Sequence, residues 1–525
     1  MKKLIKISVL FIIGVALQGA FADKKPNFII FLVDDLGYND LSCYGSENVK
    51  TPNLDAMAKN GIQFTSGYVG APVCGPSRSA LMTGSYPIRI GEPKNLKGLH
   101  TEAHAKELFI PEYLKECGYT TALFGKWHMG YKDNNTPLEQ GFDEYYGTIA
   151  HNGTQKTINP NRSKMEIWEG MKKIDMDINQ EVMSSRTKVY TEKSVDFIKR
   201  NKDKPFFLFL SHNMTHVVLG CDEAFRGKSG KGLFYDCVME LDWSMGEIRK
   251  TLKEEGIADN TVIAFLSDNG PWVESHLEDP EGNHYGSAAP LRGVKMMPWE
   301  GGHRVPYIIE YPSKIPAGQV CDEIALSMDL YATFAKLADA KLPADLKIDG
   351  KDLMPLATGE TKTSPHEYYY YYCYTRLFAI RDANWKLVLP REAKPSFMGW
   401  WARMIEEVKE IELYDLKNDI SETTNVAKEH PEVVESLLKG IENVRKTLGD
   451  YNIIGSEVRN HDADFPIENR TKNYTASLLK AAKLKADGKT QADLEAEAKA
   501  NAKAKAKAKA KARLEAEAKA EAEAQ

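Results

Sequence analysis

The chain has 525 residues, of which 42% are hydrophobic and 27% are charged, the composition of an ordinary soluble globular protein. This length allows two or three domains. The formal net charge of −5 gives no sign of nucleic-acid binding, so a polyanionic substrate would have to meet a local cationic pocket.

The first 22 residues have the pattern of a signal peptide. Three lysines precede an apolar run over residues 7–17, and Ala20-Phe21-Ala22 supplies the small residues of a cleavage site. A membrane anchor is the alternative, but the run is short for a span and no charged stop follows it. We therefore expect an exported protein, periplasmic or secreted, with no membrane span in the mature chain.

Near-continuous apolar runs recur through the first two thirds of the chain and alternate with helical patterns. Such runs are typical of strands buried on both faces, as in a mostly parallel sheet. The expected strands include Phe28–Val33, Thr121–Phe124, Pro205–Leu210 and Thr261–Leu266. The expected helices include Asn53–Asn60, Glu112–Cys117, Thr187–Arg200 and Cys237–Glu255. This alternation predicts one large α/β domain over residues 23–360, with helices flanking the sheet.

A smaller C-terminal domain is expected over residues 361–455. Four short strands are expected there, over Tyr368–Tyr374, Leu377–Ile380, Trp385–Leu389 and Glu412–Leu416. Residues 381–384 have the composition of a hairpin turn. A helix is predicted over 431–448, with proline near its start and Gly449 just past its end. We interpret this region as an antiparallel sheet packed by one helix.

Residues 456–525 form an extension with a low-complexity tail. Alanine alternates there first with lysine and then with glutamate. A period of two spreads charge around a helix instead of making one apolar face, so the tail cannot bury a core. We expect a solvated helical or disordered extension, with a surface-contact role as the alternative.

Oxygen ligands follow two of the predicted strands of the large domain. Asp34 and Asp35 follow the first strand, and Asp268 and Asn269 follow the last. Ligands of an open α/β sheet bind at the carboxyl ends of its strands, so these side chains are expected to converge. Three close carboxylates repel one another unless a cation lies between them, and an all-oxygen set suits calcium or magnesium better than zinc. Each motif taken singly could instead be a turn or a helix cap.

The other two strand ends carry cationic and titratable groups. Lys126 and His128 follow the run at 121–124, and His216 lies shortly after the run at 205–210. Histidines beside a hard-cation site would serve as acid, base or anion-binding groups instead of metal ligands.

The most specific stretch of the chain begins at Cys74 and reads Cys74-Gly75-Pro76-Ser77-Arg78. At average residue usage, the pattern Cys-x-Pro-Ser-Arg is expected by chance in about one chain in a thousand of this length. It resembles the maturation signature of the type I sulfatases, in which this cysteine is oxidised to the aldehyde formylglycine during export. The resemblance implies a formylglycine-generating maturation enzyme as a partner.

The resemblance extends to further motifs in the order of that family. They are Gly125-Lys126-Trp127-His128, Thr215-His216, Ser267-Asp268-Asn269-Gly270, the stretch Leu291-Arg292-Gly293-Val294-Lys295, and Trp299–Pro306. Similarity runs from about Asn27 to Thr447, to the branch that includes arylsulfatase A and N-acetylgalactosamine-6-sulfatase. It implies an alkaline-phosphatase-like fold with a large α/β domain and a small C-terminal sheet. It also implies one calcium ion, with magnesium as the alternative, bound by Asp34, Asp35, Asp268, Asn269 and the modified Cys74.

The resemblance further implies the roles of the remaining residues. One hydroxyl of the hydrated aldehyde attacks sulfur, and His128 deprotonates the other so that sulfate is expelled. Arg78 and Lys126 orient and stabilise the hydrated aldehyde. Lys295 and His216 bind the sulfate, and one of them protonates the leaving alcohol. For the three cations, ordinary surface charge is the alternative.

The expected activity is hydrolysis of a sulfate monoester of a carbohydrate, such as a glycosaminoglycan or an algal polysaccharide. Candidate substrate contacts are His151 and Asn152, together with Trp400 and Trp401, whose rings suit a sugar face but could equally pack against the large domain. Two other functions remain open. One is a phosphatase or phosphonate monoester hydrolase of the same superfamily, and the other is a non-catalytic carbohydrate-binding relative.

Overall fold

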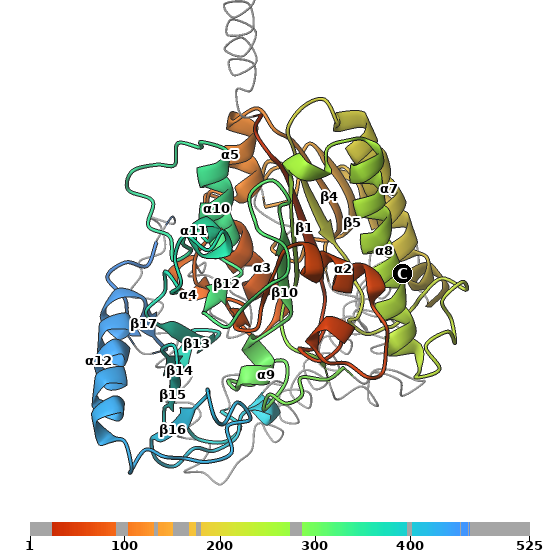
Figure 1. The fold of residues 1–525 in the computed structure, drawn as a ribbon. Coiled ribbons are helices and arrows are strands. Elements are labelled where there is room, and N and C mark those ends of the chain that lie inside the picture. Colours follow the sequence, from red (N-terminus) through yellow and green to blue (C-terminus); the bar gives the residue numbers. More distant parts are fainter. Residues whose placement is uncertain are drawn as a thin grey trace, which may run out of the picture.

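The computed structural model describes residues 24–90, 103–130, 135–150, 167–174, 180–272, 286–395, 402–451, 453–459 and 461. The expected signal peptide, nearly all of the C-terminal extension and the candidate residues His151, Asn152, Trp400 and Trp401 lie outside this part. Within it, a large α/β unit lies beside a small antiparallel sheet (Figure 1). No helix in these ranges is long and apolar enough to cross a membrane.

The large sheet is mixed, with a parallel centre. Its strands are β1 Asn27–Val33, β2 Ile62–Phe64, β4 Thr120–Lys126, β5 Glu144–Thr148, β6 Ile167–Glu169, β7 Lys172–Ile174, β8 Phe206–Ser211, β9 Thr261–Ser267, β10 Tyr307–Glu310 and β11 Gln319–Cys321. They are ordered β11-β2-β10-β9-β1-β8-β4-β5-β6-β7. Strands β9, β1, β8, β4 and β5 run parallel, whereas β10 is antiparallel to both of its neighbours. A two-stranded sheet pairs β3 Gly67–Tyr68 with β12 Ala325–Leu326.

Helices cover both faces of the sheet, as the α/β prediction requires. The helices of this unit are α2 Pro52–Asn60, α3 Cys74–Thr83, α4 Pro87–Ile90, α5 Ile110–Glu116, α6 Gln180–Ser184, α7 Arg186–Asn201, α8 Leu233–Glu254, α9 Glu300–His303, α10 Asp329–Leu337 and α11 Met354–Ala357, with 3-10 turns at Ser42–Tyr44 and Ala258–Asn260. Residues of α2, α7 and α8 share one core cluster, and residues of α3, α5 and α10 share the other. The four predicted strands and four predicted helices are confirmed to within a few residues at each end.

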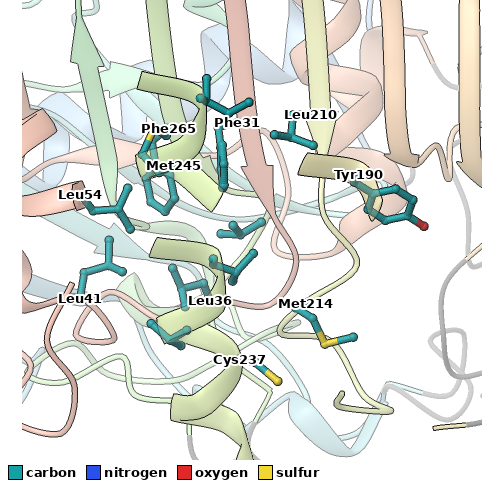
Figure 2. Close-up of a cluster of buried hydrophobic side chains, with 14 of the residues drawn as sticks. Phe31, Leu36, Leu41, Leu54, Tyr190, Leu210, Met214, Cys237, Met245 and Phe265 are labelled. Atoms are coloured by element: carbon teal, nitrogen blue, oxygen red, sulfur yellow. The ribbon is translucent and has the colours of Figure 1, made fainter. Parts of the chain in front are cut away.

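The two cores meet at β1, whose successive side chains alternate between them. Phe28, Ile30 and Leu32 belong to the core beneath α3, α5 and α10, while Ile29 and Phe31 belong to the other. Figure 2 shows the core that includes α2, α7 and α8. There Phe31 of β1, Leu210 of β8 and Phe265 of β9 lie near side chains of α8. A strand buried on both faces has no polar alternation, and this explains the continuous apolar run in the sequence.

The C-terminal unit is the predicted antiparallel sheet with one helix. Its strands are β13 Tyr369–Cys373, β14 Arg376–Arg381, β15 Trp385–Val388 and β16 Glu412–Asp415, paired in that order. Helix α12 Pro431–Thr447 packs on them through Leu437, Ile441 and Val444. A short ribbon of β17 Gly449–Asp450 and β18 Ile453–Ile454 follows. The turn predicted at 381–384 connects β14 to β15.

A buried ionic network joins the two units at α9, which lies between them in Figure 1. Glu300, the first residue of α9, is fully buried and accepts a hydrogen bond from Tyr371 of β13. The Lys386 Nζ of β15 lies 3.2 Å from Glu300 Oε1 and 2.7 Å from Glu422 Oε1. Lys386 and Glu422 are likewise enclosed, so one buried lysine bridges two buried carboxylates. The motif Trp299–Pro306 therefore connects the units of the fold.

Replacing Lys386 by methionine is expected to lower the free energy of unfolding by about 3–5 kcal/mol, because two buried carboxylates lose their shared cation. Denaturant unfolding followed by circular dichroism measures the change. Lys409→Met is the matched control, since Lys409 lies 3.8 Å from Glu407 on the surface and should contribute little. Equal stability of the two variants would contradict this role for Lys386.

Candidate active site

The strand register brings the polar strand ends to one level. Leu32 of β1 pairs with Ser211 of β8, and Ser211 also pairs with Gly125 of β4. On the other side, Val33 of β1 pairs with Ser267 of β9. The residues that follow these positions are thus carried to the same edge by four adjacent parallel strands.

Three buried carboxylates at this edge each face a buried cation. Lys126 Nζ lies 2.5 Å from Asp34 Oδ2, and Lys295 Nζ lies 2.5 Å from Asp35 Oδ1. Arg78 donates from Nε to Asp268 Oδ2 at 2.7 Å. All six side chains are at most 2% exposed, so the three cations are not ordinary surface charge.

Cys74 is the first residue of α3 and is 5% exposed. Its sulfur, with one carboxylate oxygen from Asp34 and one from Asp268, forms a group of atoms that all lie within 4.8 Å of one another. The next residue, Gly75, packs against the loop of His128. A Cβ atom at Gly75 would stand 3.2 Å from the His128 carbonyl oxygen. Helix α3 therefore carries Cys74 into the centre of the carboxylate group and places Arg78 one turn farther on.

Several oxygens of the site have no hydrogen-bond partner among the described residues. They are Asp34 Oδ1, Asp35 Oδ2 and Asn269 Oδ1, and all three are buried. Leaving a buried carboxylate oxygen unsatisfied is costly unless a cation meets it. A hard divalent ion takes several such oxygens at once, so the donor set fits calcium or magnesium. The Asn269 amide also donates from Nδ2 to Asp35 Oδ1 at 2.7 Å, which ties the two loops together.

The pKa values of two groups at this edge are shifted by burial and by the neighbouring charges. Burial raises the pKa of the Asp268 carboxyl, and the neighbouring Asp34 charge raises it further. Burial also raises the pKa of the Cys74 thiol, although Lys126 and Lys295 oppose this. The encoded cysteine is therefore a neutral thiol near pH 7, which is a poor nucleophile.

The three histidines near the strand ends occupy different positions. His128 is half-buried, with a left-handed backbone of φ 56° and its carbonyl oxygen beside Gly75, the neighbour of Cys74. His216 Nε2 lies 3.8 Å from Asp35 Oδ2, so it borders the carboxylate group. His212 instead faces the core: its Nε2 lies 3.2 Å from Ser244 Oγ of α8, and burial lowers its pKa to about 3. It is a neutral core histidine and takes no part in the site.

Further residues complete the surroundings of the site, and two of them, Tyr374 and Met296, were not apparent from the sequence. The Ser211 hydroxyl accepts a hydrogen bond from Arg78 at 2.6 Å, and the Thr215 backbone N–H donates to the Asp34 carbonyl at 2.6 Å. From the small unit, the Tyr374 hydroxyl lies 3.9 Å from Met296 Sδ. Tyr374 and Met296 belong to the buried cluster that contains Cys74. Their aromatic and apolar character carried no functional signal, because only the packing of the two units brings them to Cys74.

Two family models match the chain. The model described as Sulfatase matches residues 26–340, and the model described as N-sulphoglucosamine sulphohydrolase, C-terminal, matches residues 294–447. N-acetylgalactosamine-6-sulfatase of Canis lupus familiaris is 35% identical over 430 residues, covering 79% of this chain and 80% of that protein. Steryl-sulfatase of Homo sapiens is 34% identical over 440 residues, covering 69% of this chain and 74% of that protein. Among solved structures, Ps i-CgsB in complex with k-i-k-neocarrahexaose has a TM-score of 0.69 at 27% identity, covering 87% of this chain and 98% of that one.

Proposed function

The chain belongs to the sulfatase family and is a sulfuric ester hydrolase, and we propose that it works through a formylglycine made from Cys74 with one bound calcium ion. The observation that carries this proposal is the set of buried, unpartnered oxygens of Asp34, Asp35 and Asn269 beside Cys74. Asp34, Asp35, Asp268, Asn269 and the modified Cys74 would hold the ion, with magnesium as the alternative. When bound, the ion neutralises negative charge on the sulfate group as the transition state forms.

The charge balance of the site supports a monoanionic substrate. Three carboxylates face three cations, so the protein groups alone are near neutrality. A divalent ion would leave an excess of about two positive charges, which one sulfate ester group and one ionised hydroxyl of the hydrated aldehyde would balance. Lys295 and His216 lie on the Asp35 side of the site, where they would hold the sulfate oxygens and donate a proton to the departing alcohol oxygen.

Conversion of Cys74 to formylglycine would give the site a nucleophile that can both attack sulfur and release the sulfate. Its thiol is neutral and buried, and a thiolate that had attacked sulfur would have no ready route to release the sulfate. A hydrated aldehyde carries two hydroxyls, so one can attack while the loss of a proton from the other releases the product. Arg78 and Lys126 would orient these hydroxyls, and His128 would accept the proton of the second hydroxyl.

The substrate we propose is a sulfated carbohydrate met after export, in the periplasm or outside the cell. The name of the canine relative and the neocarrahexaose bound in the similar structure support this class. The N-terminal pattern supports export, and export would bring the chain to a formylglycine-generating maturation enzyme.

The first test compares two aryl esters in the purified enzyme. We expect kcat/KM for 4-nitrophenyl sulfate to exceed that for 4-nitrophenyl phosphate by at least about 100-fold, because a sulfate ester and one ionised hydroxyl of the hydrated aldehyde balance the charge of the site, whereas a phosphate monoester brings one negative charge more. Initial rates at matched concentrations give the ratio. A preference for phosphate would identify a phosphatase or phosphonate hydrolase instead. No turnover of either ester by protein carrying the aldehyde would favour the non-catalytic relative.

A further inference from the structure

The small C-terminal unit reaches the nucleophile through the turn between β13 and β14. Cys373 Sγ lies 3.7 Å from the carbonyl oxygen of Met296, next in sequence to Lys295. Phe378 of β14 belongs to the same buried cluster as Cys74 and Met296. The side of β14 that carries Phe378 therefore packs in the same buried cluster as Cys74 and Met296.

Arginines gather around two aromatic rings, Phe378 of this cluster and Trp299 of the neighbouring core. The guanidinium groups of Arg376 and Arg391 lie 5.4 Å and 5.6 Å from the centre of the Phe378 ring. Arg391 also lies 4.9 Å from the centre of the Trp299 ring, on which Arg292 stacks at 3.5 Å. Arg292 and Trp299 lie on either side of Lys295 in sequence, so the loop that supplies Lys295 also borders this arginine group.

The positive charge of this group is only partly neutralised. Arg292 forms an ion pair with Glu406 at 2.8 Å. Arg391 is 5% exposed, and its two terminal nitrogens have no hydrogen-bond partner within the described ranges. Arg391 donates only from Nε, to the Glu406 carbonyl oxygen at 3.1 Å. Arg376 is half-buried, and no carboxylate of the described residues pairs with it or with Arg391. Unmet guanidinium donors in an enclosed place favour an anionic partner.

We propose that Arg376 and Arg391 form an anion subsite beside the sulfate pocket, which binds a second acidic group of the substrate. The inference rests on the proposed function, because it assumes that the scissile sulfate lies between Cys74 and Lys295. Planar guanidinium groups match both carboxylate and sulfate oxygens through paired hydrogen bonds. The substrate class is therefore a carbohydrate that carries a uronate carboxylate or a second sulfate near the sulfate that is removed.

Alkane-α,ω-disulfonates of increasing chain length test this subsite without a choice of sugar. Each is paired with the monosulfonate of equal length, and a sulfonate cannot be hydrolysed as an ester. Calorimetry on the wild-type holoenzyme should show at least one disulfonate binding about tenfold more tightly than its monosulfonate, the effect expected of one charge-assisted hydrogen-bond pair. A matching ω-sulfonated carboxylate series shows whether a carboxylate or a second sulfate is preferred.

Arg376→Gln should reduce this preference for the dianion to about twofold or less, and Arg391→Gln should do the same if it folds. Arg226→Gln is the control, because Arg226 pairs with Glu223 in a loop of the large unit and should leave the preference unchanged. The subsite is excluded if wild-type protein binds both series equally, or if the preference survives in Arg376→Gln. Turnover of 4-nitrophenyl sulfate by the wild type is measured separately, so a failed sulfatase assay is distinguishable from a failed subsite.

Discussion

Cys74→Ala is expected to lower kcat for an aryl sulfate by about 10⁵-fold or more, which is the scale of removing a covalent nucleophile. Cys74 lies with Asp34 and Asp268 in one group of atoms, beside the buried cations that face these carboxylates. The thiol is small and nearly enclosed, so alanine should leave the fold intact. Initial rates and a melting curve of the purified variant separate lost chemistry from lost stability.

A second experiment distinguishes an aldehyde at position 74 from an unmodified thiol. Wild-type protein produced with a formylglycine-generating enzyme should be active, and mass spectrometry of the peptide that spans Cys74 should show the mass of the aldehyde. Protein produced without that enzyme should keep the thiol and be inactive. Cys117→Ala is the matched control, since Cys117 is a half-buried cysteine that follows α5. Full activity with an unmodified thiol at Cys74 would refute the mechanism.

Removal of the metal ion is expected to have the second largest effect. Chelation should lower kcat/KM by about 10³-fold, because several kcal/mol of charge stabilisation at the sulfate group is lost. Chelation should also lower the melting temperature, since an ion present at 100 times its dissociation constant stabilises the folded state by about 2.7 kcal/mol. Added calcium should restore both, and elemental analysis of the untreated protein gives the identity and number of bound ions.

The variant Asp34→Asn tests the same metal site by mutation. It removes a charged oxygen from the site while keeping nearly the same shape, so melting of this variant should no longer respond to chelator. Asp222→Asn serves as the control, because Asp222 lies in a loop after β8 where it pairs with Lys188 at the surface. A wild-type protein whose activity and melting temperature are both insensitive to exhaustive chelation would exclude the metal.

Some features of the site could be predicted because neighbouring parallel strands turn sequence order into spatial order. Asp34, Lys126 and Asp268 each stand at the end of a strand, and β4, β8, β1 and β9 are adjacent. Once those strands are recognised, their carboxyl ends must share one edge of the sheet. The Cys74 motif could be recognised from its residue types alone.

Other features could not be predicted, because they depend on contacts between distant segments. Strand β10 lies antiparallel between β9 and β2, and its short run gives no sign of which neighbours it pairs with. The same is true of Glu300, which reads as one residue of a motif but becomes an anchor once Lys386 of the small sheet is packed against it. His212 shows the converse, since it directly follows strand β8 but its side chain faces the core.

The sequence by itself determined the α/β class, the smaller antiparallel unit and the chemistry available around Cys74, because apolar periodicity and residue type are local properties. Only the tertiary structure decided which cation faces which carboxylate, which buried oxygens lack a hydrogen-bond partner among the described residues, and which side chains of the small unit pack in the cluster of Cys74. These depend on burial and on distances between segments hundreds of residues apart, and no local pattern encodes them. The place of the arginines around Phe378 belongs to this second kind, since Phe378 joins the buried cluster of Cys74 only when the two units pack together.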